Sequence, residues 1–325
     1  MNVLIAGGAG FIGSHLTRRL IAAHHRVVVL DNFVTGRRRN LDDLARSASL
    51  TILDVDVSEP LRHPVLTHHF DRVYHLASPA SPVGYSEHPL ETLTVNSRGT
   101  HELLDLAHRN GARFLPTATS EVYGDPLVHP QREDYWGNVN PIGPRSCYDE
   151  GKRFAESLTV TYAWQKGLDV RIARLFNTYG PGMDPADGRM IPNFCVQALS
   201  GEPLTIYGDG SQTRSLCFVD DTVEGLIRLM ETDGIGGEVV NLGNPLEQSV
   251  LEMAEHLIHL AGSDSPINLR PLPVDDPMRR KPDIAKAHRL LGWSPTIPLA
   301  EGLPRTLDYF RTYVRVAQKA LAVSV

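Results

Sequence analysis

Short apolar runs rich in β-branched residues alternate with amphipathic segments through the first half of the chain. The apolar runs are NVLIA (2–6), RVVVLD (26–31), LTILDVD (50–56), RVYHLAS (72–78) and ARFLPTAT (112–119). Between the first two lies GSHLTRRLIAAH (13–24), whose apolar residues recur at helical spacing. Strands that alternate with helices in this way predict an α/β fold of Rossmann type, a doubly wound parallel sheet with helices on both faces.

The second half has a different pattern. From about residue 176 the chain contains loops rich in Gly and Pro, such as NTYGPGMDPADGRMIP (177–192), with shorter elements between them. This change predicts a cofactor-binding Rossmann domain over residues 1–175 and a smaller α/β substrate-binding lobe mainly over residues 176–325. Later segments of the chain are expected to return to the first domain.

Residues 88–111 read as one long helix. Apolar residues recur along it at Leu90, Leu93, Val95, Leu103, Leu104 and Leu106. Gly111 follows as a C-terminal cap. The apolar side chains either pack wholly on the sheet or leave a stripe for a partner subunit, and the sequence pattern fits both.

Pro116 interrupts a run that otherwise reads as a central strand. Proline has no N–H to donate to a neighbouring strand. We therefore expect a β-bulge or a missing hydrogen bond just before Thr119, with a small displacement of the hydroxyl groups that follow.

Three glycines at a spacing of three residues follow the first strand and open the first helix: Gly7, Gly10 and Gly13. Glycines there let the backbone turn tightly and approach a pyrophosphate, whose charge is stabilised by the helix N-terminus. Asp31 ends the next strand, where a carboxylate can accept hydrogen bonds from a ribose and repel a 2′-phosphate. The pattern predicts NAD rather than NADP. The predicted cofactor site also includes Phe11, Ile12, Asn32, Asp56 and Leu76.

The basic run Arg37 to Arg39 allows a second interpretation, because arginines after this strand can select the 2′-phosphate of NADP. The alternative is a solvated loop, which we favour because Asp31 stands closer to the ribose.

Tyr148 and Lys152 lie one helical turn apart at the start of a predicted long helix, so their side chains share a face. An ammonium beside a phenol stabilises the phenolate and lowers the pKa of the tyrosine toward neutrality. A tyrosine tuned in this way can remove the proton of a sugar hydroxyl while its carbon gives up a hydride. The pair is common on helix surfaces, but the glycine pattern upstream favours a catalytic role. Tyr148 and Lys152 are also predicted to contact the nicotinamide ring of the NAD cofactor.

The composition of the chain excludes further classes of protein and kinds of site. The chain has 325 residues, 42% of them hydrophobic, and a net charge of −6, which excludes the basic surface typical of nucleic-acid binding. Three separated cysteines support neither a disulfide framework nor a zinc site. His63, His68 and His69 lack the spacing of metal ligands, and we predict no metal site. No signal peptide or membrane-spanning segment is evident, so a cytoplasmic protein is expected.

The glycine pattern, the Tyr148–Lys152 pair and the Ser/Thr-rich strand end before them resemble the extended short-chain dehydrogenases that modify nucleotide sugars. Within that family the strings ASPASP, TSEVYGDPLVHPQREDYWG, NPIGPRSCYDEGKR, QTRS, VNLGNP and DDPMRRKPDI resemble the UDP-glucuronate decarboxylases along nearly the whole chain. The resemblance implies that UDP-glucuronate is oxidised at C4. A ketone there makes the uronate carboxyl a β-keto acid that loses CO2, and return of the hydride gives UDP-xylose and regenerates NAD.

Ser120 and Glu121 stand side by side before the Tyr–Lys pair. Similar 4,6-dehydratases have Asp before that Glu, because a departing 6-hydroxyl needs an acid, whereas the hydroxyl of Ser120 suits a reaction in which no water leaves. Glu121 is expected either to handle the C5 proton or to repel the substrate carboxylate. Thr119 is expected to be a third hydrogen-bonding partner for the C4 oxygen of the sugar, beside Tyr148 and Ser120.

The resemblance also supplies the rest of the substrate site. It places Asn177 and Arg214 at the sugar diphosphate, Arg280 at the diphosphate or the uronate carboxylate, Tyr207 at the uracil and Tyr85 near the sugar. It implies a homodimer formed by the helices at about 90–110 and 145–166. Two alternatives stay open at this point: a UDP-hexuronate 4-epimerase, and a catalytically inactive NAD-binding scaffold protein.

Overall fold

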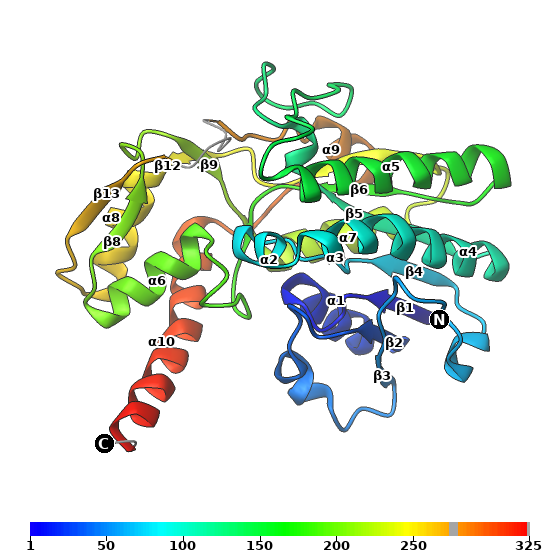
Figure 1. Cartoon of the computed structure of the whole chain (residues 1–325), viewed down its shortest axis with the longest axis horizontal. Helices are drawn as coiled ribbons and strands as arrows, with labels where there is room; N and C mark the ends of the chain where they lie inside the picture. The colour runs from blue at the N-terminus through cyan, green and yellow to red at the C-terminus, as the bar shows by residue number, and fades with distance from the viewer. Residues whose placement is uncertain (273–278, 324–325) are drawn as a thin grey trace.

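The computed structural model describes residues 1–272 and 279–323, and its centre is a seven-stranded sheet in the order β11-β6-β5-β4-β1-β2-β3 (Figure 1). All of its strand pairs are parallel. The strands are β1 (Asn2–Ala6), β2 (Arg26–Asp31), β3 (Leu50–Asp54), β4 (Arg72–His75), β5 (Arg113–Thr119), β6 (Ile172–Leu175) and β11 (Val239–Leu242). The order of the strands reverses between β1 and β4, since β2 and β3 are added on one side of β1 and the later strands on the other. A crevice forms at the carboxyl ends of the strands at such a point. The predicted Rossmann-type α/β fold is confirmed.

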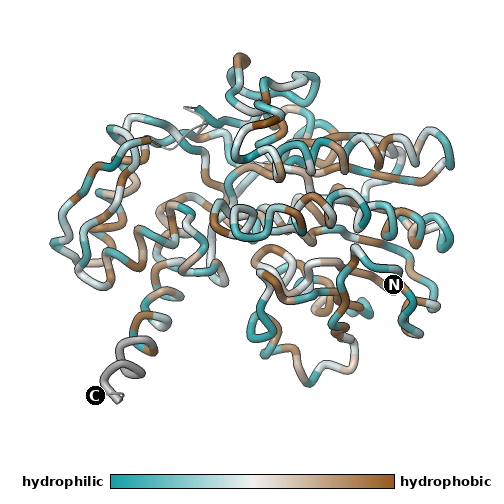
Figure 2. Tube along the Cα trace, in the orientation of Figure 1, coloured by the Kyte–Doolittle hydropathy of each residue, from teal (hydrophilic) through white to brown (hydrophobic). Residues whose placement is uncertain are grey.

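Helices cover both faces of the sheet (Figure 1). One face carries α1 (Phe11–Ala22), α7 (Val219–Glu231) and α9 (Ala285–Leu291), and the other carries α3 (Pro89–Thr94), α4 (Thr100–Asn110) and α5 (Ser146–Lys166). Successive side chains of a strand point to opposite faces. In β1, Val3 and Ile5 accordingly join the core that includes α1 and α7, and Leu4 and Ala6 join the core under α4 and α5. Figure 2 shows the hydrophobic colouring concentrated along these strands.

The second lobe lies at the carboxyl edge of the sheet, to the left in Figure 1. Its helices are α6 (Met190–Ser200), α8 (Val250–Ala261) and α10 (Leu299–Val323), and its strands are β8 (Leu204–Tyr207), β9 (Thr213–Ser215), β12 (Glu247–Ser249) and β13 (Ile267–Arg270). Two-stranded pairs form between β8 and β13, between β9 and β12, and between β7 (Thr178–Tyr179) and β10 (Cys217–Phe218). Because β11 lies in the large sheet, the chain crosses between lobes more than once, and the division into domains at residue 175 stays a prediction.

The helix expected over residues 88–111 forms with one irregularity. It consists of α3 and α4 joined by a π-helical turn at Val95–Gly99, and Gly111 caps it in the left-handed conformation. Among the described residues no helix is both long and apolar enough to cross a membrane.

The β-bulge expected at Pro116 does not form. Pro116 pairs in register with His75 of β4. On the other side the Phe114–Val170 bridge and the Thr117–Ala173 pair keep one register. The missing N–H of proline therefore removes one hydrogen bond of the sheet without inserting a residue, and the register is kept up to Thr119.

Candidate active site

The glycine turn after β1 leaves no room for side chains. Gly7 has φ of +81°, and a Cβ on it would lie 2.6 Å from the backbone of Ala77. A Cβ on Gly13 would lie 2.1 Å from the carbonyl oxygen of Gly7. Gly10 is the N-cap of α1, and the first turn carries no acidic residue. The first N–H groups of a helix have no partner within it, so this end of α1 is suited to bind a phosphate.

The carboxylate of Asp31 lies at the far end of this turn. It accepts hydrogen bonds from the backbone N–H groups of Ala9 and Phe33, each at 2.9 Å. Burial raises the pKa of Asp31, and these two hydrogen bonds oppose that rise. Asp31 lines a small pocket together with Gly7, Gly10, Asn32, Asp56 and Leu76, which are all among the predicted cofactor residues.

The arginines that follow are engaged with carboxylates of the chain itself. Arg37 forms an ion pair with Asp184. Arg38 lies 4.0 Å from the ring centroid of Phe33 and 2.7 Å from a carboxylate oxygen of Asp54. Two cations of the basic run are thus neutralised locally.

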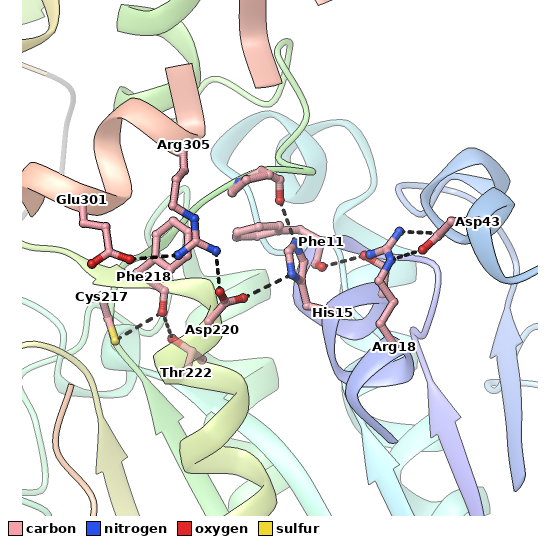
Figure 3. Close-up of polar contacts among 12 residues, drawn as sticks. Phe11, His15, Arg18, Asp43, Cys217, Phe218, Asp220, Thr222, Glu301 and Arg305 are labelled. Atoms are coloured by element: carbon pink, nitrogen blue, oxygen red, sulfur yellow. Dashed lines mark hydrogen bonds and ion pairs between the residues drawn. The ribbon is translucent and has the colours of Figure 1, made fainter. Parts of the chain in front are cut away.

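The helix that opens at the glycine turn is tied to the second lobe, as Figure 3 shows. His15 of α1 lies with Nε2 2.8 Å from the carbonyl oxygen of Pro181 and with Nδ1 3.7 Å from Asp220 of α7. The Asp220 carboxylate also accepts a hydrogen bond from Arg305 of α10 at 2.7 Å. These contacts fix the cofactor helix, the loop after β7 and the last helix around one cleft.

Tyr148 and Lys152 face this cleft from the first turns of α5. The Lys152 ammonium donates to the carbonyl oxygen of Thr117 at 2.9 Å and lies 5.9 Å from the ring centroid of Tyr148. Burial lowers the pKa of Lys152 to about 8. Burial also raises the pKa of Tyr148, although a hydrogen bond with Thr119 opposes that rise. The predicted lowering of the Tyr148 pKa is therefore absent in the protein alone, because desolvation of the phenolate outweighs the effect of its partners.

Glu121 is clamped by two guanidinium groups. Arg280 holds it in a bidentate pair, with Nη1 2.5 Å from Oε1 and Nη2 2.6 Å from Oε2. Arg145 binds Oε2 from the other side at 2.6 Å. Glu121 and Arg280 are both more than nine-tenths buried. Two neighbouring cations screen the charge of Glu121, so this geometry argues against the predicted repulsion of the substrate carboxylate and favours a role as a fixed acceptor.

Asp149 adds a second buried carboxyl beside this clamp. Its side chain is 7% exposed, and its Oδ1 has no hydrogen-bond partner among the described residues. Burial, reinforced by the charge of Glu121, raises its pKa to about 7. A buried carboxyl beside a second carboxylate keeps its proton to a higher pH than an exposed one.

Replacement of this carboxyl gives a test of the linkage between pH and stability. The folded protein keeps the Asp149 proton up to about pH 7, whereas the unfolded chain releases it near pH 4, so stability falls as pH rises across that interval. Asp149→Asn has the same shape and cannot ionise. We expect it to raise the free energy of unfolding at pH 8 by roughly 2–4 kcal/mol, with little change at pH 4, in urea titrations.

The neighbouring Glu150 provides the control, because it is partly exposed and lies 3.6 Å from the guanidinium of Arg153 in an exposed ion pair. Glu150→Gln should change stability by less than about 1 kcal/mol at either pH. Equal effects of the two substitutions at pH 8 would contradict a proton held on Asp149.

One cleft of about 1360 Å³ connects the cofactor turn with the second lobe. It is lined by the predicted catalytic residues Thr119, Ser120, Glu121, Tyr148, Lys152 and Arg280 and by the predicted substrate residues Tyr85, Asn177, Tyr207 and Arg214. Phe11, Ile12 and Gly13 of the predicted cofactor site also line it. The structure thus brings these residues together, and their individual roles stay predictions.

Tyr85 and Tyr207 differ in setting. Tyr85 is buried and stacks on Tyr148, with ring centroids 5.2 Å apart, whereas Tyr207 is 46% exposed at the rim of the cleft. Tyr85 thus contacts the tyrosine directly. Arg145 and Asp149 were missed by the sequence reasoning, although both lie in the NPIGPRSCYDEGKR string.

Comparisons with known proteins place the chain among nucleotide-sugar enzymes. Residues 3–243 match the NAD dependent epimerase/dehydratase family. The chain is 53% identical to UDP-glucuronic acid decarboxylase 1 of Xenopus tropicalis over 310 residues, which cover 95% of this chain and 72% of that protein. It is 51% identical to UDP-glucuronic acid decarboxylase 6 of Arabidopsis thaliana, over 98% of this chain and 91% of that protein.

Among solved structures, the UDP-glucuronic acid 4-epimerase of Bacillus cereus, in complex with UDP-glucuronic acid and NAD, superposes with a TM-score of 0.86 at 30% identity. That match covers 96% of this chain and all of the epimerase chain.

Proposed function

Because this chain belongs to the NAD dependent epimerase/dehydratase family and, within it, to the UDP-glucuronic acid decarboxylases, we propose that it converts UDP-glucuronate to UDP-xylose and CO2 with NAD regenerated in each cycle. The observation that carries the proposal is the cleft in which the Tyr148–Lys152 pair meets Glu121 in its arginine clamp. The first pair suits oxidation of a sugar hydroxyl, and the arginines of the second group suit a sugar that carries a carboxylate.

The glycine turn fits NAD. Side chains at Gly7 and Gly13 would collide with backbone, so the turn can admit a pyrophosphate closely. Asp31 would accept hydrogen bonds from the adenosine ribose, and its charge disfavours the 2′-phosphate of NADP. Arg37 and Arg38 are already paired with Asp184 and Asp54, which supports NAD. NAD held there would supply an acceptor for the hydride of the C4 carbon of the sugar, and its reduced form a donor for the return step.

The residues proposed to surround C4 of the sugar transfer one proton to and from its hydroxyl. Tyr148 removes it from the C4 hydroxyl during oxidation and gives it back during reduction, while Lys152 stabilises the phenolate. The hydroxyl of Thr119 lies within hydrogen-bond reach of Tyr148 and orients the C4 oxygen. The resulting ketone is β to the uronate carboxyl, so the C–C bond to CO2 breaks and its electrons form an enolate.

Glu121, Ser120 and Arg280 serve the decarboxylation. Ser120 hydrogen-bonds the sugar without having to protonate a leaving hydroxyl. Arg280 has both terminal nitrogens on Glu121, whereas its Nε is buried without a partner among the described residues. Asn177 and Arg214 are proposed to bind the diphosphate, and Tyr207 the uracil.

Incubation with UDP-glucuronate tests this function. We expect loss of the mass of CO2 from the nucleotide sugar and, in D2O, one deuteron in the UDP-xylose formed, because C5 must be protonated after CO2 leaves. A UDP-hexuronate 4-epimerase would instead keep the carboxyl group and give an isomer of unchanged mass. Recovery of unaltered UDP-glucuronate would overturn the proposal.

A homodimer formed through α3, α4 and α5 is part of the proposal. Leu90 and Leu93 of α3 and Phe154 and Trp164 of α5 expose 73%, 41%, 50% and 78% of their surface on these adjacent helices. A cluster of exposed apolar side chains is typical of a protein interface.

A charged residue among the exposed apolar side chains of α3 and α5 tests the dimer. Phe154→Glu should shift the protein toward a monomer in light scattering, because an unpaired carboxylate would be desolvated at the interface. Leu269→Glu, at a comparably exposed residue of β13, is the matched control and should leave the mass unchanged. A wild-type protein of monomer mass at micromolar concentration would exclude the dimer.

A further inference from the structure

Arg280 lies on a segment without helix or strand, just before α9. A side chain that clamps a carboxylate needs a fixed backbone beneath it, because a shift of about 1 Å can cost about 100-fold in rate. The contacts of residues 280–283 therefore determine whether the clamp on Glu121 holds.

Gln131 makes three of these contacts. It is completely buried and lies in the VHPQ string of the sequence. Its backbone N–H donates to the carbonyl oxygen of Lys281, and its Oε1 accepts from the N–H of the same residue, each at 2.8 Å. Its carbonyl oxygen accepts from the N–H of Asp283, also at 2.8 Å. Three hydrogen bonds from one residue thus fix the backbone directly after Arg280.

A second path ties the same segment to the turn that carries Glu121. Tyr123 of that turn donates its hydroxyl to Oδ1 of Asn241 at 2.7 Å. The Nδ2 of Asn241 lies 3.1 Å from the carbonyl oxygen of Gln131 and 3.2 Å from that of Asp283. The turn is therefore held to residues 280–283 at both ends, through the clamp at Glu121 and through this buried amide at Tyr123.

We infer that Gln131 is a positioning residue, which holds residues 280–283 so that the guanidinium of Arg280 stays on the carboxylate of Glu121. Its amide offers an acceptor to Lys281 and a donor to the carbonyl oxygen of Val128, at 2.9 Å, without adding charge. A leucine fills the same space and offers neither. The activity test of this inference rests on the proposed decarboxylation, whereas a second readout does not.

A double-mutant cycle on CO2 release measures the coupling. Gln131→Leu should lower kcat about 10- to 100-fold with little change in the affinity for NAD. In an Arg280→Lys background the same change should cost less than about 3-fold, because its target is already impaired. A merely structural role would give equal losses in both backgrounds. Gln197→Leu is the matched control, since Gln197 bonds the backbone N–H and the hydroxyl of Thr205 in the second lobe.

Amide hydrogen exchange provides the readout that does not depend on activity. In Gln131→Leu the peptide containing residues 279–284 should exchange faster, whereas peptides of β1 and α1 should not change. Unchanged exchange, or full additivity with Arg280→Lys, would overturn the inference. A wild-type protein that releases no CO2 would instead refute the proposed function, and the exchange result would still decide the role of Gln131.

Discussion

Tyr148→Phe is expected to lower kcat for CO2 release by about 10³-fold or more, because the variant lacks the group that removes the C4 proton. The ring stays in place, stacked on Tyr85, so the cleft keeps its shape. Loss of the hydroxyl removes the proton acceptor and its hydrogen bond with Thr119. Affinity for NAD, measured by calorimetry, should therefore change little.

Tyr162→Phe is the matched control on the same helix. Tyr162 is buried, and its hydroxyl donates to Asp105 at 2.8 Å, away from the cleft. Its loss should change stability slightly and leave kcat within a few-fold. If the wild type and Tyr148→Phe were equally inert while both bound NAD, the protein would be a scaffold rather than an enzyme.

The parts of the site predicted from sequence are those whose geometry is local. A glycine turn between a strand and a helix specifies its own backbone, so Gly7 and Gly13 could be placed without knowledge of the rest. Tyr148 and Lys152 share a face because four residues make about one helical turn. The parallel sheet with helices on both faces followed from the alternation of apolar runs and amphipathic segments.

Contacts between distant segments could not be predicted in this way. Arg145 reaches Glu121 only because the loop after the catalytic turn folds back over it. Gln131 lies in the string TSEVYGDPLVHPQREDYWG that carried the resemblance. Its partner Lys281, however, lies 150 residues further along the chain. The pKa of Tyr148 was expected to fall because charge was considered without burial. Of the two outcomes expected at Pro116, a β-bulge or a missing hydrogen bond, the β-bulge was wrong because neighbouring pairs keep their register.

Glu121→Gln is expected to give the second large effect, with CO2 release lowered by about 100-fold or more. The amide keeps the shape of the carboxylate but leaves the guanidinium groups of Arg280 and Arg145 facing a neutral partner. Removal of one member of a buried ion pair costs about 3–5 kcal/mol, because the remaining charge is desolvated without compensation. Unfolding by urea should therefore occur at a lower concentration.

Loss of stability and loss of chemistry can be separated with a second substitution. In Glu121→Gln combined with Arg280→Gln, one unpaired cation is removed, so much of the stability should return while CO2 release stays low. Arg132→Gln is the control for removing an arginine, because the Arg132 pair with Asp134 is solvent-exposed. Activity that recovered together with stability in the double variant would show that Glu121 only supports the fold. Because Arg280 is itself proposed to serve the reaction, the double variant is compared with Arg280→Gln alone. Activity well below that of Arg280→Gln in an equally stable protein would place the Glu121 carboxylate in the decarboxylation itself.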